Sequence, residues 1–303
     1  MHPAPSMIVF TVLSGLGLGM IAWIGLGIGG GSHLFGWIAA PMALVIAALG
    51  GAASVGHLGR PDRAWRAFSQ WRSSWLSREA CLMIATMGVF VVYVALWLLT
   101  DTRLRLLGWI AAALAMATVY ATAMIYHQLR TIPRWSGTPT PAMFVVFSLV
   151  GGLLGTGGAM SLAGLDAPTF WTLLAVIFAA AVAVWWQTQA AGARRGLNGS
   201  SMETATGLGR IGRVRLFEPP HTGSNYLLSE MAYRIGRARA FQLRKLGAIL
   251  GFLVPLGLVV LSWLIGDWAL LVALICHVAG MLALRWLFFA EAEHVQALYY
   301  GIR

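Results

Sequence analysis

The sequence has little cysteine and little charge. Its 303 residues include two cysteines, Cys81 and Cys276, which form no C-x-x-C motif. Because iron–sulfur clusters are held by sets of cysteine thiolates, we expect no iron–sulfur cluster and no metal site in this chain. Charged residues make up only 10% of the sequence, against roughly 25% in a typical soluble domain. The composition therefore excludes an ordinary soluble globular protein.

Long apolar runs take the place of the missing charge. Hydrophobic residues make up 59% of the chain, and the mean hydropathy is +0.76. A bilayer core takes about 20 apolar residues as a helix, because no water is present there to satisfy the backbone. We therefore predict an all-α integral membrane protein, a single membrane domain over residues 1–303 with eight transmembrane helices. The eight spans are expected at about residues 7–29, 34–56, 80–99, 104–126, 142–163, 170–190, 245–265 and 268–290.

Basic residues are distributed unevenly between the loops on the two sides of the membrane. An even number of spans puts both termini on one side, and on the other side only Arg103 and Arg105 of the 21 Lys and Arg residues are found. Since cytoplasmic loops carry the excess of Lys and Arg, we predict that both termini lie in the cytoplasm. The expected location is the bacterial cytoplasmic (inner) membrane. No basic residue precedes the first span, so we expect it to be a retained span and not a cleaved signal peptide.

The predicted cytoplasmic loops are the long ones, at residues 57–79, 127–141 and 191–244. Their basic residues adjoin apolar spans, so the net charge of +11 favours anionic lipids and an acidic protein partner over nucleic acid. Residues 229–244 have the pattern of a basic amphipathic helix. This helix is either an interfacial segment on the lipid surface or a docking surface for a soluble subunit.

Glycine recurs in the first and fifth spans, at Gly15, Gly17, Gly19, Gly151 and Gly155 among others. Small residues allow the backbones of two helices to approach closely within a membrane. We therefore expect these glycines to serve close helix packing and not to line a ligand cleft.

Histidine is the residue type that decides between a haem site and other redox chemistry. A b-type haem inside a membrane usually needs two axial histidines on facing helices. Of the seven histidines, only His277 lies near the middle of a span. We therefore predict no haem, and we interpret His277 as a hydrogen-bonded packing residue.

Several other polar residues gather where spans reach the predicted cytoplasmic face. His57, His127 and His294 follow the second, fourth and eighth spans, Glu79 opens the third, and Arg285 lies near the end of the eighth. A quinone headgroup exchanges protons at two oxygens, and a histidine titrates near neutral pH and both donates and accepts hydrogen bonds. A quinone site is one interpretation of this set. For Glu79, the alternative is a structural ion pair with Arg78 or Arg60, and Ser77 is a candidate N-cap of the third span.

Three motifs carry a resemblance to a known family. The first is HLG-x-P-x-RA at residues 57–64, followed by S-x-LS-x-E at residues 74–79. The second is T-x-P-x-W at residues 131–135 with Thr140-Pro141, and the third is an Arg followed by aromatic residues at residues 285–289. In these motifs and in the eight-span plan, the protein resembles the membrane-anchor subunit of dimethyl sulfoxide reductase.

The resemblance implies a specific role. Such anchors carry no redox centre of their own, bind quinone (ubiquinone or menaquinone), and hold a four-cluster ferredoxin-like subunit and a molybdopterin catalytic subunit. The resemblance assigns quinol binding to His57, and it maps the glutamate of the second motif onto Glu79. We accordingly predict His57 and Glu79 as the catalytic pair, with Arg60, His127 and Arg285 around the quinone headgroup. The partner subunits are expected to dock on the three long cytoplasmic loops.

The predicted cytoplasmic position of the His57 loop refines this expectation. Together with the long basic loop, it resembles the branch that anchors a cytoplasmic sulfite dehydrogenase, in which electrons run from sulfite to quinone. The alternatives are a quinol-oxidising anchor of a dimethyl sulfoxide reductase-type terminal reductase, a passive anchor with the quinone bound elsewhere, and a secondary transporter. A transporter places its substrate near the midplane between broken helices, whereas the polar residues here gather at one surface.

Overall fold

The computed structural model describes residues 4–196, 201–218, 239–292, 294 and 295. Within these ranges every regular element is a helix, and eight helical segments are long and apolar enough to cross a membrane. The predicted all-α protein with eight spans is thus confirmed. The eight spans are α1 (Pro5–Leu26), α2 (His33–Ala53) with the short helix η1 (Ser54–His57), α3 (Trp75–Thr100), α4 (Arg105–His127), α5 (Pro139–Leu162), α6 (Thr169–Gly196), the continuous α10 (Ala240–Ala248), η5 (Ile249–Leu253) and α11 (Val254–Ile265), and α12 (Ala269–Ala290).

Two spans begin five residues earlier than the hydropathy indicates. The third begins at Trp75, because the side chain of Ser74 accepts a hydrogen bond from the Ser77 backbone N–H at 3.5 Å. Ser74 is therefore the N-cap, and the prediction of Ser77 as the cap is wrong. The seventh begins at Ala240, and the middle of this span is the π-helix η5. Residues 219–238, and with them most of the basic helix expected over residues 229–244, lie outside the described residues.

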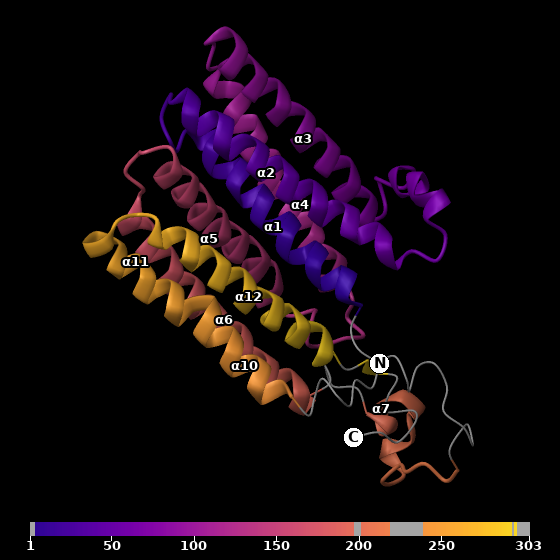
Figure 1. Ribbon diagram of the computed structural model, residues 1–303. Coiled ribbons are helices and arrows are strands. Elements are labelled where there is room, and N and C mark those ends of the chain that lie inside the picture. The colour runs from indigo at the N-terminus through magenta and orange to yellow at the C-terminus, as the bar shows by residue number, and fades with distance from the viewer. Residues whose placement is uncertain (1–3, 197–200, 219–238, 293, 296–303) are drawn as a thin grey trace.

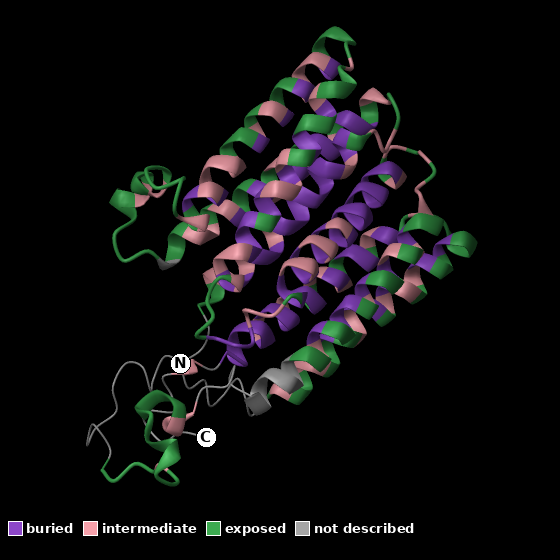
Figure 2. Ribbon diagram, turned by 180° about the vertical axis from the view of Figure 1, so that it is seen from behind, coloured by how far each residue is buried: buried purple, intermediate pink, exposed green. Residues whose placement is uncertain are grey.

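Helices α1 and α5 form the centre of the bundle (Figures 1 and 2). Helix α1 packs on α2, α4 and α5, whereas α12 packs on α5, α10 and α11. The two central helices are the most completely buried of the spans. They thereby join one group of helices, α1 to α4, to a second group made of α5, α6, α10 to α11 and α12.

Glycines make the contact between the two groups close. A Cβ atom at Gly19 of α1 would overlap the carbonyl oxygen of Ser148 of α5, and one at Gly155 would lie 2.8 Å from the sulfur of Met20. On the other side of α1, a Cβ at Gly17 would lie 2.7 Å from the Cα of Ala47. The expectation that these glycines serve close packing is confirmed.

The long connections lie at one end of the bundle, where α2, α4, α6 and α12 end; we call it the long-loop end. It holds the 3-10 helix η2 (Pro61–Phe68) and the short helix α7 (Met202–Thr206) (Figure 1). At the opposite end the spans are joined by short turns at residues 27–32, 101–104, 163–168 and 266–268. Substantial surface outside the spans is therefore available on one face only.

Candidate functional site

Glu79 lies in the second turn of α3 at the long-loop end, and its side chain is buried. The hydroxyl of Thr122 on α4 donates a short hydrogen bond to its carboxylate. Arg78 instead donates to the carbonyl oxygens of Trp71 and Arg72 at 3.0 and 2.7 Å. In the described structure neither Arg78 nor Arg60 pairs with Glu79, so the structural ion pair considered for this residue is not formed.

Arg285 of α12 places its guanidinium group at the same end of the bundle. It is buried, and its Cζ lies 3.4 Å from the ring centroid of Phe144 and 5.8 Å from that of Phe288. Tyr126 of α4 is buried against the same two rings, at centroid distances of 5.7 and 5.4 Å. Thr122, which bonds Glu79, lies one turn before Tyr126 on α4. The structure therefore places Glu79 and Arg285 around the same end of α4.

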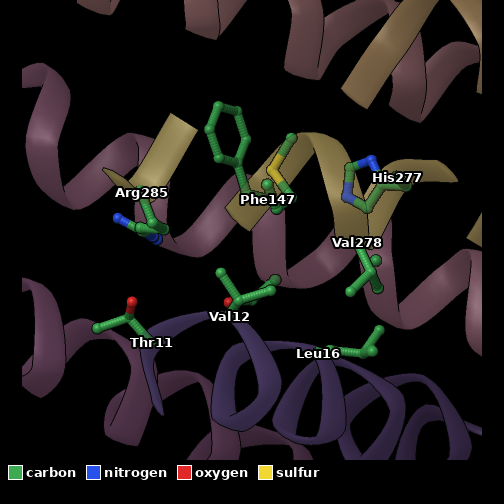
Figure 3. A pocket seen from close by; sticks show the side chains of 10 residues that line it. Thr11, Val12, Leu16, Phe147, His277, Val278 and Arg285 are labelled. Atoms are coloured by element: carbon green, nitrogen blue, oxygen red, sulfur yellow. The ribbon is translucent and has the colours of Figure 1, made fainter. Parts of the chain in front are cut away.

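A small cavity adjoins Arg285 between α1, α5 and α12 (Figure 3). Its volume is about 20 Å³, and it is lined by Thr11, Phe147, His277 and Arg285 among others. The Nη1 of Arg285 and the Nε2 of His277 are buried and have no hydrogen-bond partner among the described residues. A cavity of this size has room for about one water molecule. The cavity extends the polar cluster from the long-loop end towards the middle of the membrane.

His277 itself is held by the backbone. Its Nδ1 lies 2.7 Å from the carbonyl oxygen of Gly251, within the π-helix η5. The prediction of a hydrogen-bonded packing residue is confirmed for this nitrogen.

The remaining predicted site residues have different surroundings. His127 ends α4, and its Nδ1 lies 3.2 Å from the carbonyl oxygen of Gly137, so it fixes the loop between α4 and α5. The exposed side chain of Arg60 bonds Asp62 at 3.4 Å. The backbone of His57 ends η1 at the long-loop end, and its side chain lies outside the described part of the structure. Of the predicted residues whose side chains are described, Glu79 and Arg285 are therefore the two that are buried inside the bundle.

Sequence reasoning missed Tyr126 and Thr122. Both lie on α4, one turn apart, at the end that carries His127. A hydroxyl on each successive turn of a helix that faces another span is the signal that marks them. This signal is weak, because Thr also occurs in membrane helices for packing.

A second buried network was also missed. Arg134, in the loop after α4, donates to Glu291 at 2.6 Å and to the carbonyl oxygen of Trp186 at 3.2 Å, and it lies 4.0 Å over the ring of Trp186. Glu291 follows α12 directly and also accepts from Arg244 of α10 at 2.6 Å. These bonds tie the loop after α4 to the long-loop ends of three helices. Arg134 of the T-x-P-x-W motif thus has a structural role, because it holds this loop to the neighbouring helices.

Comparison with known proteins places this geometry in a family. Residues 1–203 match the family described as DMSO reductase anchor subunit (DmsC). The sequence is 32% identical to a sulfite dehydrogenase subunit of Allochromatium vinosum, in an alignment that covers 99% of each protein. It is 31% identical to a polypeptide of the anaerobic dimethyl sulfoxide reductase of Escherichia coli over 130 residues, which span 40% of this protein and 44% of that one. The protein is therefore a multi-pass membrane protein that belongs to the DMSO reductase anchor subunit (DmsC) family.

Proposed function

We propose that this protein is the membrane anchor and quinone-reactive subunit of a molybdopterin and iron–sulfur oxidoreductase that oxidises sulfite in the cytoplasm. The observation that carries the proposal is the similarity to the sulfite dehydrogenase subunit, which extends over 99% of both proteins. The similarity to the dimethyl sulfoxide reductase polypeptide spans 40% of this protein. The first relative is therefore the better guide to the whole subunit.

The buried cluster at the long-loop end has the chemistry that a quinone headgroup requires. When bound, a quinone accepts two electrons from the partner subunit and takes up two protons. Arg285 contributes a buried donor, Nη1, that has no partner among the described residues; the cavity beside it, of about 20 Å³, has room for a water molecule that relays a proton but not for the headgroup itself. Glu79, bonded to Thr122, exchanges a proton with the site. To His57 we assign the exchange of protons between the site and bulk water.

The long-loop end also has the surface that partner subunits need. Ile211 and Phe217 are 85% and 98% exposed, and Arg213 and Arg215 lie between them. Large exposed apolar side chains outside the spans mark protein interfaces, and the arginines favour an acidic partner. A ferredoxin-like iron–sulfur subunit docks here and on the loops at residues 57–79 and 127–141, with the molybdopterin subunit beyond it. The positive charge of these loops favours a cytoplasmic position for this face in a bacterial inner membrane.

The test is electron transfer by the purified complex carrying His57→Ala. Sulfite-dependent reduction of a soluble dye should be unchanged, while sulfite-dependent reduction of a quinone analogue should fall about 100-fold, the effect of removing one acid–base group. His33→Ala is the matched control, because His33 pairs with Asp101 at the opposite end of the bundle. Normal quinone reduction by His57→Ala contradicts the assignment.

The same preparation separates the alternatives. A complex that oxidises quinol with dimethyl sulfoxide, and leaves sulfite unchanged, is a terminal reductase. A complex with clusters but no quinone dependence is a passive anchor. A protein that purifies alone and moves a solute across vesicles is a transporter.

A further inference from the structure

A groove opens on the side of the bundle between α6, α10 with η5, and α12. Its volume is about 580 Å³, within the roughly 300–1,000 Å³ of typical ligand pockets. Val184 of α6, Leu253 of η5 and Leu284 of α12 contribute to its apolar walls. Val184 and Leu253 are each 62% exposed, and on a membrane-spanning segment an exposed apolar side chain faces lipid. The groove is therefore open to the acyl-chain region of the bilayer.

One end of this groove is polar. Gln187 of α6, Arg244 of α10 and Glu291 line it together with the apolar residues. Gln187 lies one turn beyond Val184 towards the end of α6, Arg244 lies in the middle of α10, which begins the seventh span, and Glu291 directly follows α12. All three therefore lie at the long-loop end. The groove has an apolar body within the membrane and a polar end near its surface, which is the shape of a lipid.

Two hydrogen-bond donors at the polar end are buried and unused. They are the Nε of Arg244 and the Nε2 of Gln187, and neither has a partner among the residues that the structure describes. The other polar atoms are engaged, since Gln187 Oε1 accepts from Arg134 at 3.3 Å and Arg244 Nη2 donates to Glu291 at 2.6 Å. A buried donor without a partner is costly. A ligand for this end must therefore supply acceptors.

The charges around the groove favour an anion. Arg239 and Lys245 are exposed on either side of Arg244, and no acidic residue occurs from residue 239 to residue 265. Glu291 forms ion pairs with the guanidinium groups of Arg134 and Arg244, which balance its negative charge. A phosphate has only acceptor oxygens and a negative charge, so the basic residues at this end of the groove attract it.

We propose that this groove binds one anionic phospholipid. Its phosphate accepts hydrogen bonds from Arg244 Nε and Gln187 Nε2, and one acyl chain lies along Val184, Leu253 and Leu284. The site is independent of the proposed quinone chemistry, because it lies on the lipid-facing side of α6 and α10 and includes neither Glu79 nor Arg285. The lipid closes the crevice between the two helices at the level where α12 ends.

Native mass spectrometry of the full-length protein tests the proposal. The protein is purified in detergent and supplied with equal amounts of phosphatidylglycerol and phosphatidylcholine, with and without ubiquinone. Wild-type protein should retain one phosphatidylglycerol in preference to phosphatidylcholine. Arg244→Gln should lower the retained fraction about tenfold, because a hydrogen bond to a charged group is lost. Lys245→Gln is the matched control: it removes the neighbouring charge, which lies outside the groove lining, and should change retention less than about twofold, as expected of a screened surface charge.

A second variant keeps the test decisive if Arg244→Gln fails to fold. Ala248 lines the groove and is exposed, so Ala248→Trp narrows the groove while every charged residue of its polar end is kept. It should abolish retention of phosphatidylglycerol. Equal retention of the two lipids, equal effects of Arg244→Gln and Lys245→Gln, unchanged retention in Ala248→Trp, or displacement of the lipid by ubiquinone would each overturn the proposal.

Discussion

Loss of Arg134 should destabilise the protein more than loss of Arg244, although both donate to Glu291 at 2.6 Å. The side chains of Arg134 and Glu291 are only 4% and 1% exposed, whereas that of Arg244 is 42% exposed. Removing one partner of a buried ion pair costs roughly 3–5 kcal/mol, because a buried charge is left behind. Since Glu291 keeps Arg244, we expect Arg134→Gln to cost about 3 kcal/mol, the lower end of that range.

Because the side chain of Arg244 is partly exposed, water can replace some of the interactions that Glu291 loses when Arg244 is removed. We therefore expect Arg244→Gln to cost about 1 kcal/mol. The double variant of Arg134→Gln with Glu291→Gln should cost less than the sum of its single changes, because no unpaired buried charge remains. Unfolding of the purified protein by SDS in mixed micelles, followed by circular dichroism, measures these free energies. Equal costs for the two arginines, or additive costs in the double variant, would refute the reasoning.

Three further outcomes are expected. Glu79→Gln should leave assembly intact and lower quinone reduction by the complex at least about tenfold, whereas an unchanged rate would remove this carboxylate from the site. Gly152→Leu should destabilise the bundle by about 2 kcal/mol or more, because a Cβ there would lie 2.6 Å from a backbone atom of α1; Gly88→Leu, with nothing within 4 Å, should unfold like wild type. Hydrogen bonds to its own backbone N–H, to Ser201 and to Val214 lower the pKa of Glu203. The loop that Glu203 holds is thus stable above the usual carboxyl range and should open as pH falls through the lowered pKa, seen as a smaller hydrogen-exchange protection factor at the Val214 amide, after division by the intrinsic exchange rate at each pH.

The spans could be predicted because length and apolarity decide them. In lipid, the backbone N–H and C=O groups must form hydrogen bonds within the protein. A run of about 20 apolar residues therefore has few conformations other than a helix. The start of the third span was missed because hydropathy rises only at Ala80, whereas the hydroxyl of Ser74 begins the helix at Trp75. A cap depends on local geometry that composition does not describe.

The candidate site was predicted less completely, for a different reason. Glu79 and Arg285 were found because ionisable residues in spans are rare and expensive. Tyr126 was not, because nothing in the sequence says which face of α4 meets α12. The pairing of Arg134 with Glu291 joins residues separated by 157 positions. Only the packing of the helices places two such charges together.

The contact between α1 and α5 limits how this protein can move. At Gly19, Gly152 and Ser148 the backbones of α1 and α5 are in contact, so no side-chain layer at this crossing can slide or re-pack. Carriers that alternate their opening between the two membrane faces depend on rocking of one half against the other. We therefore expect the two helix groups to keep one relative arrangement, with the exchange of protons and electrons taking place at the long-loop end.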